Sequence, residues 1–86
     1  NDGRKVKGWL PKLNFSKPNL VVQIIKEATN EILYTVRVKG RSFQPKVYDS
    51  GNYTIKVGKD LPNKVVESKL SPVKDSKRAD TREVSL

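Results

Sequence analysis

The sequence predicts an all-β fold, a small antiparallel β-sandwich of about six to seven short strands with flexible termini. Residues 53–57 alternate between apolar and polar side chains, which is the pattern of a strand with one buried face. The turn sequence Asp49-Ser50-Gly51 directly precedes that strand, and its glycine tolerates a positive φ. Residues 20–27 form the most apolar run, and their β-branched side chains favour a strand over a helix.

The strands before the turn at residues 49–51 are predicted mainly from the same alternation of apolar and polar side chains. Residues 1–9 are mostly polar and basic and are expected to form a linker or leading arm. Leu13 and Phe15 alternate with polar neighbours and predict a short first strand. A polar loop joins residues 20–27 to residues 32–39, which predicts an antiparallel pair whose first strand is central or covered on both sides for part of its length.

Further strands are expected at residues 46–48, 52–57 and 64–70, so the β-sandwich domain spans residues 10–70. In the last strand the pattern leaves two orientations open, with either Val66, Ser68 and Leu70 or Val65 and Glu67 facing inward. The predicted core consists of the inward apolar positions of these strands, namely Leu20, Val22, Ile24, Ile32, Tyr34, Val36, Val38, Val47, Tyr53, Ile55 and Val57.

The composition changes at residues 71–86, where apolar side chains are few and charges are many. Such a segment buries too little apolar surface to offset the entropy lost on ordering. A charged, flexible tail is therefore expected, with a short helix over residues 76–84 as the alternative.

The composition excludes several kinds of chemistry. The 86 residues allow one domain with a small core. The chain has no Cys, which removes disulfides and thiol chemistry, and no His, which removes imidazole as a base or metal ligand. It also has no Met, even at position 1, and no run near the roughly 18–20 apolar residues of a membrane helix. We therefore expect a processed or excised piece that is not an enzyme, with no catalytic residue, cofactor, metal or membrane span.

Basic residues outnumber acidic ones 18 to 9, giving a net charge of +9. A net positive charge of this size suggests nucleic acid or another anionic polymer as a partner. The excess is spread along the chain, since residues 1–18 carry five basic and one acidic group (+4), residues 19–70 nine and five (+4), and residues 71–86 four and three (+1). The candidate residues for an anionic ligand are Arg37, Lys39, Arg41 and Lys56. The alternative, which we favour, is a solubilising exterior whose edge charges discourage strand pairing.

Two further groups of side chains are candidate sites. Glu27 and Glu31 flank a hairpin loop, as a calcium site or an acid/base pair requires, but charges in such loops are mostly solvated. Trp9 and Phe15 are candidates for stacking on sugars, yet in a chain with few aromatic residues such rings are more often needed for the core.

The order of several segments resembles known β-sandwich modules. The run Gly51-x-Tyr53-x-Ile55-x-Val57 is similar to a strand of immunoglobulin-like and carboxypeptidase-regulatory-like modules. Residues 10–58 as a whole resemble the β-sandwich segment near the C-terminus of alkaline phosphatase D-like and related metallophosphoesterase proteins of bacteria. The segments that carry this resemblance are residues 10–15, 19–23, 32–40, 43–47 and 51–57.

The resemblance implies an immunoglobulin-like sandwich that serves as a non-catalytic accessory domain of a larger exported bacterial protein. The phosphoesterase activity of such proteins resides in a separate metal-binding domain, whose His and Asp ligands have no counterpart here. The expected partners are other domains of the parent protein, the expected location is extracytoplasmic (periplasmic, cell-surface or secreted), and the domain is expected to be monomeric. The runner-up is an anionic-polymer module, and a third hypothesis, a neutral-glycan module, requires an exposed ring such as Trp9.

Overall fold

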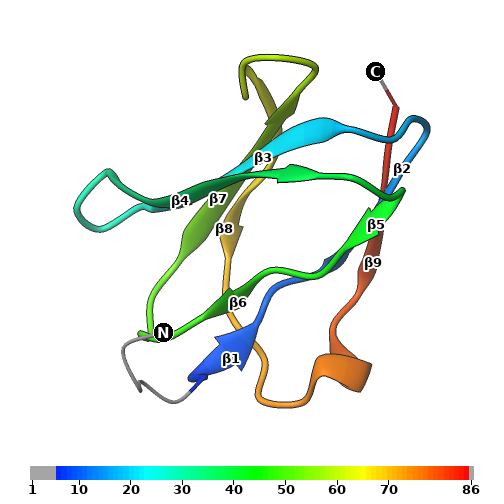
Figure 1. Ribbon diagram of the computed structural model, residues 1–86. Helices are drawn as coiled ribbons and strands as arrows, with labels where there is room; N and C mark the ends of the chain where they lie inside the picture. The colour runs from blue at the N-terminus through cyan, green and yellow to red at the C-terminus, as the bar shows by residue number, and fades with distance from the viewer. Residues whose placement is uncertain (1–5, 86) are drawn as a thin grey trace.

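The computed structural model describes residues 6–85 and shows an all-β fold, as the sequence predicts (Figure 1). The predicted strands at residues 20–27, 32–39, 46–48, 52–57 and 64–70 are confirmed within a residue or two at each end. The elements are β1 (Gly8–Trp9), β2 (Lys12–Phe15), β3 (Leu20–Lys26), β4 (Glu31–Val38), β5 (Ser42–Phe43), β6 (Lys46–Val47), β7 (Tyr53–Gly58), β8 (Lys64–Leu70), the short 3₁₀ helix η1 (Ser76–Arg78) and β9 (Thr81–Val84).

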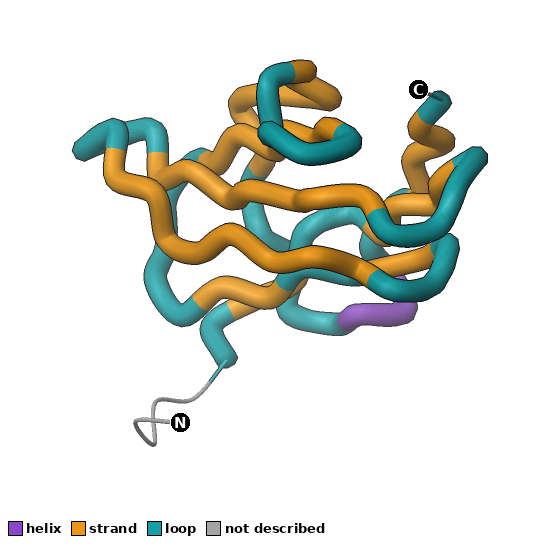
Figure 2. Tube along the Cα trace, turned by 45° about the horizontal axis from the view of Figure 1, so that its top comes forward, coloured by secondary structure: helices purple, strands orange, loops and turns teal. Residues whose placement is uncertain are grey.

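Two sheets pack together in a sandwich-like arrangement. One sheet is antiparallel with the strand order β4-β3-β7-β8, the other has the order β5-β2-β9, and β1 pairs with β6 beside them. Apolar side chains from both sheets form a single core, which includes Leu13 and Phe15 from β2 and Ile24 and Ile55 from β3 and β7. Figure 2 shows the strands running across the molecule, with η1 below them at the lower right.

Most of the predicted core is confirmed. β3 is central, between β4 and β7, and its first three residues are buried on both faces, as expected for a strand covered on both sides. The predicted core residues that are buried are Leu20, Val22, Ile24, Val38, Val47, Tyr53, Ile55 and Val57, while Tyr34 and Val36 are partly buried against them. The core also contains Leu10, Leu13, Phe15, Leu70 and Val84.

Ile32 was predicted to be inward, and this prediction is wrong. The β3–β4 pairing shifts register between Ile24 and Ile25, so that Ile24 lies opposite Tyr34 while Ile25 lies opposite Ile32. The extra residue reverses the alternation along β4, because an inserted residue moves every following side chain to the other face. Ile32 therefore faces outward and is 54% exposed.

The expected tail is wrong for its last part, because residues 81–84 form β9. This strand runs parallel to β2, with Leu13 opposite Arg82 and Phe15 opposite Val84. Val84 is only 4% exposed, because it covers apolar surface that β2 alone leaves open. The alternative, a helix over residues 76–84, is reduced to the three residues of η1.

The leading arm is also shorter than expected, since residues 8–9 pair with β6 as strand β1. Residues 1–5 of that predicted arm lie outside the described residues. Together with β5 and β9, β1 brings the described chain to nine strands, more than the six to seven predicted. The added strands are short or come from polar sequence, so their hydrophobic patterns are weak.

Neither of the two orientations predicted for residues 64–70 holds along the whole strand, because the pairing of β8 with β7 is irregular. Leu70 lies opposite the inward Tyr53 and Glu67 opposite the inward Ile55, whereas Val65 lies opposite the outward Lys56. The register shifts twice along this pair, so neither strict alternation holds.

The loop between β7 and β8 folds directly over its own strand. A Cβ atom on Gly58 would lie 1.6 Å from the Leu61 carbonyl oxygen, so only glycine fits at this position. The loop and η1 lie at opposite ends of the molecule (Figures 1 and 2).

Candidate functional site

Arg37 holds the β7–β8 loop in place. It lies on the outer face of β4, opposite Val21. Its Nη1 donates to the carbonyl oxygens of Asn19 (2.6 Å) and Lys59 (3.2 Å), and its Nη2 lies 3.9 Å from Asp60 Oδ1. The guanidinium therefore joins three chain segments, and this predicted ligand residue already has protein partners.

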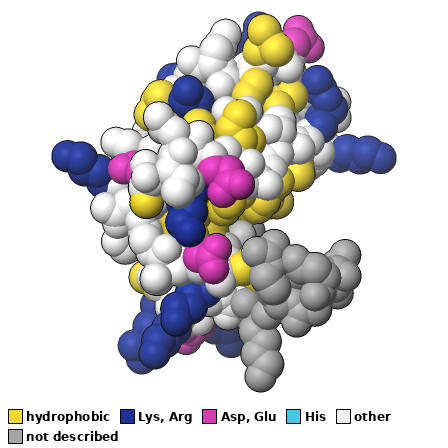
Figure 3. Space-filling view, turned by 90° about the vertical axis from the view of Figure 1, so that its left-hand side faces the viewer, with side chains coloured by type: hydrophobic (Ala, Val, Ile, Leu, Met, Phe, Trp, Pro, Cys, Tyr) yellow, Lys and Arg dark blue, Asp and Glu magenta, His cyan; other side chains and the backbone are white. Residues whose placement is uncertain are grey.

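The other predicted basic residues do not converge on one site. Lys56 is on the outer face of β7, opposite Gln23, and is half-buried. Lys39 and Arg41 are exposed in the connection between β4 and β5. On the face drawn in Figure 3, Lys and Arg side chains lie scattered around hydrophobic ones and not in one patch.

A close pair of lysines was missed by the sequence reasoning. The ammonium group of Lys59 lies near that of Lys17, and this close approach of two donors with like charge lowers the pKa of Lys17. Lys17 follows β2 and Lys59 follows β7, and no sequence pattern links these two turns. Like charges repel one another, and an anion placed between them relieves that repulsion.

The carboxylate of Glu27 ties together three strands. Its Oε2 accepts hydrogen bonds from Thr54 Oγ1 (2.7 Å) and from the backbone N–H of Lys69 (2.5 Å). The bond from Lys69 is the main cause that lowers the pKa of Glu27, followed by the bond from Thr54. Glu31 lies opposite Lys26 and is exposed. Within residues 6–85, no group of three or more His, Cys, Asp or Glu side chains could hold a metal ion.

Tyr53 forms a corner at the start of β7. Its ring is fully buried, and its hydroxyl donates a hydrogen bond to the carbonyl oxygen of Asp49 at 2.8 Å. Between them Gly51 has φ = 119°, as the turn sequence predicted. Lys26 Nζ lies 3.6 Å from Asp49 Oδ2 and adds a second contact to the turn. A tyrosine at the start of a strand that bonds backward to the main chain is a feature of immunoglobulin domains.

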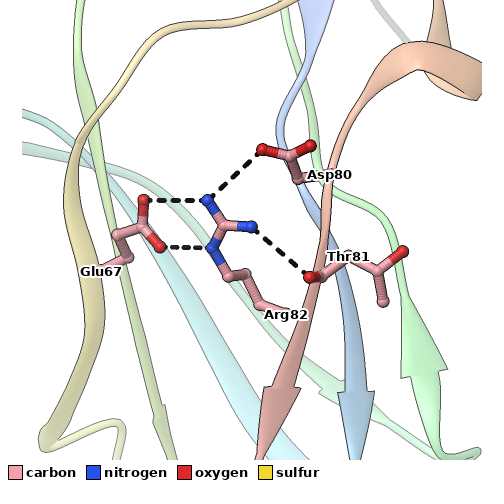
Figure 4. Close-up of polar contacts among 4 residues, drawn as sticks. All are labelled: Glu67, Asp80, Thr81 and Arg82. Carbon is pink, nitrogen blue, oxygen red and sulfur yellow. Dashed lines mark hydrogen bonds and ion pairs between the residues drawn. The ribbon is translucent and has the colours of Figure 1, made fainter.

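An ion pair closes one side of the sandwich (Figure 4). Arg82 on β9 donates from Nε to Glu67 Oε1 (2.5 Å) and from Nη2 to Glu67 Oε2 (3.4 Å), so the two edge strands are joined. Asp80 Oδ2 lies 3.5 Å from Arg82 Nη2, and Nη1 donates to the Thr81 carbonyl oxygen. The bond with Glu67 is the first cause that raises the pKa of Arg82.

A pocket of about 120 Å³ lies beside this ion pair. Its lining includes the ring-bearing residue Trp9, the buried Pro11 and Leu70, and the polar residues Arg78, Asp80 and Arg82. Trp9 is half-buried, whereas Phe15 is 6% exposed and belongs to the core. Of the two predicted stacking residues, only Trp9 is therefore placed beside open space.

Comparisons with protein-family models, with curated proteins and with solved structures found no match to this chain. Over residues 6–85, no helix is long and apolar enough to cross a membrane.

Proposed function

We propose that this chain is a non-catalytic, immunoglobulin-like accessory domain of a larger exported bacterial protein, and that it packs on and positions a catalytic domain of phosphoesterase type. The sandwich-like fold and the Tyr53–Asp49 corner support the immunoglobulin-like assignment. The order of segments in residues 10–58, which resembles metallophosphoesterase-associated modules, supports the kind of parent protein.

The observation that carries the packing role is the outer face of the four-stranded sheet. Ile32 and Val65 are outward and are 54% and 52% exposed. Ile25 lies opposite Ile32 on the same face and is half-buried. The solvent face of an antiparallel sheet is normally polar, so exposed β-branched side chains on this face favour contact with a neighbouring domain.

The test begins with an antibody against the domain, used on fractionated source cells. We expect a band well above 9.7 kDa in an extracytoplasmic fraction. A band of about 9.7 kDa alone, or one confined to the cytoplasm, contradicts the proposal. Hydroxyl-radical footprinting of that larger protein should then show Ile32 and Val65 protected relative to the isolated domain. If the two side chains react as fast in the larger protein as in the isolated domain, the domain does not pack through this face.

The second candidate is an anionic-polymer module, and the contact between Lys17 and Lys59 favours it. Together with the net charge of +9, this contact gives a polyanion a place to relieve like-charge repulsion. Titration with heparin and single-stranded DNA at increasing salt tests it, since polymer binding must weaken steeply with salt. Micromolar binding that is lost when Lys17 and Lys59 are replaced by Gln supports this candidate, and no binding by the folded domain rejects it.

A further inference from the structure

The pocket beside η1 combines an aromatic side chain with planar polar groups. We propose that it binds one neutral pyranose unit of a glycan chain. This inference does not depend on the packing role, because the pocket is lined by residues that include Trp9, Arg78 and Arg82, whereas the proposed packing surface is the outer face of the four-stranded sheet.

The indole is held on a rigid part of the backbone. The backbone N–H of Trp9 donates to the carbonyl oxygen of Val73 at 2.7 Å, and the backbone carbonyl oxygen of Trp9 accepts from the Val73 N–H at 2.9 Å. On its other side it pairs with Lys46 of β6. A ring held in this way loses little freedom when a ligand binds, and its apolar face suits the C–H face of a sugar.

The polar groups suit hydroxyl groups. Asp80 has a side chain that is 74% exposed, while its carbonyl oxygen accepts from the Lys12 N–H at 2.8 Å, so the carboxylate is accessible on a fixed backbone. Arg78 is also exposed, and it supplies a planar set of N–H donors. Carboxylate and guanidinium groups can each contact two neighbouring hydroxyls of a pyranose, and buried Pro11 and Leu70 give the pocket an apolar inner wall.

The charge of the pocket favours a neutral ligand over an anion. Arg78 and Arg82 bring two positive charges, and Asp80 together with Glu67, which pairs with Arg82, brings two negative ones. The four charges cancel, so the pocket offers no net attraction to a phosphate or a carboxylate. Its volume of about 120 Å³ is below the roughly 300–1,000 Å³ of pockets that enclose a whole small molecule, so a single sugar ring would rest against the pocket and the rest of the chain would lie outside.

The experiment uses Trp9, the only tryptophan of the chain, as a fluorescent reporter. The domain is titrated with laminarin, cellohexaose, mannohexaose and xylohexaose, and with heparin as the anionic comparison. We expect at least one neutral glycan to shift the Trp9 emission in a saturable way that does not change with salt. No shift with any of the four neutral glycans, or a shift with heparin alone that disappears in salt, overturns the proposal.

Variants then assign the binding to this pocket. Arg78→Gln and Asp80→Asn should each weaken glycan binding at least tenfold while leaving the circular-dichroism spectrum unchanged, because both side chains are exposed. Lys39→Gln, at an exposed position in the β4–β5 connection, is the matched control and should bind as the wild type does. Equal affinity of all three variants places any binding elsewhere and contradicts the proposal, even if Trp9→Ala fails to fold.

Discussion

The hydroxyl of the buried Tyr53 donates a hydrogen bond to the carbonyl oxygen of Asp49, four residues earlier in the chain. This bond fixes the turn that reverses the chain into β7 and thereby sets which side chains of β7 enter the core. The turn is further shaped by Gly51, whose positive φ a larger side chain rarely adopts. Tyr53 therefore contributes both to the geometry of the turn and to the packing of the core.

Replacing Tyr53 with Phe should lower the free energy of unfolding by about 1 kcal/mol, because it removes one hydrogen bond and keeps the ring. Urea unfolding followed by circular dichroism measures the change. The slope of the unfolding transition should stay the same, since the folded state buries the same surface. A midpoint identical to that of the wild type means that the corner adds nothing to stability.

Truncating Ile55 to Ala should cost roughly 2–5 kcal/mol, because Ile55 is fully buried between the sheets. Ile32→Ala is the matched control, with the same chemical change at an outward position of β4. Its cost should be below about 1 kcal/mol in the isolated domain. Equal costs at the two positions contradict the register shift in β4.

The packing of β9 is tested by Val84→Ala, which should lower the free energy of unfolding by roughly 1–2 kcal/mol. The neighbouring Ser85 is exposed, so Ser85→Ala should change stability by less than about 0.5 kcal/mol. If the end of the chain were an unattached tail, both substitutions would be silent in thermal and urea unfolding.

Alkaline pH should destabilise the fold through Tyr34. Burial is the main cause that raises the pKa of Tyr34 from 10.0 to about 12. The neutral phenol therefore contributes stability that is complete below pH 10 and is lost as the pH rises from 10 towards 12. The Tyr34→Phe variant should lose stability less steeply over this range. Urea midpoints as a function of pH give the comparison, and parallel curves for the two proteins refute it.

The sequence predicted the central sheet because β3, β4 and β7 carry apolar side chains at the spacing that a buried face requires. It failed at Ile32, because a register shift arises from the pairing of two strands and leaves no mark in either strand alone. It failed again at β9, where only Val84 is buried and charged neighbours conceal the strand. In both cases the pairing with a strand elsewhere in the chain determines which side chains are buried.

The surface was harder to predict than the core. Arg37 resembled a free cation in the sequence, yet its partners are carbonyl oxygens and Asp60, which the loops bring to it. Trp9 is a candidate stacking residue from the sequence, but no sequence pattern links Arg78 and Asp80 to it. Such groupings depend on how the termini fold back, which hydrophobic spacing does not encode.

The parallel pairing of β2 with β9 has a consequence for how the protein is made. Asn14 and Glu83 are 69 residues apart in the chain and yet lie opposite each other, joined by a side-chain hydrogen bond of 3.0 Å. The ribosome synthesises the chain from the N-terminus, so β2 can pair with β9 only after nearly the whole domain has been synthesised. Until then the inner face of the larger sheet lacks part of its cover, and final folding should follow release of the last strand from the exit tunnel.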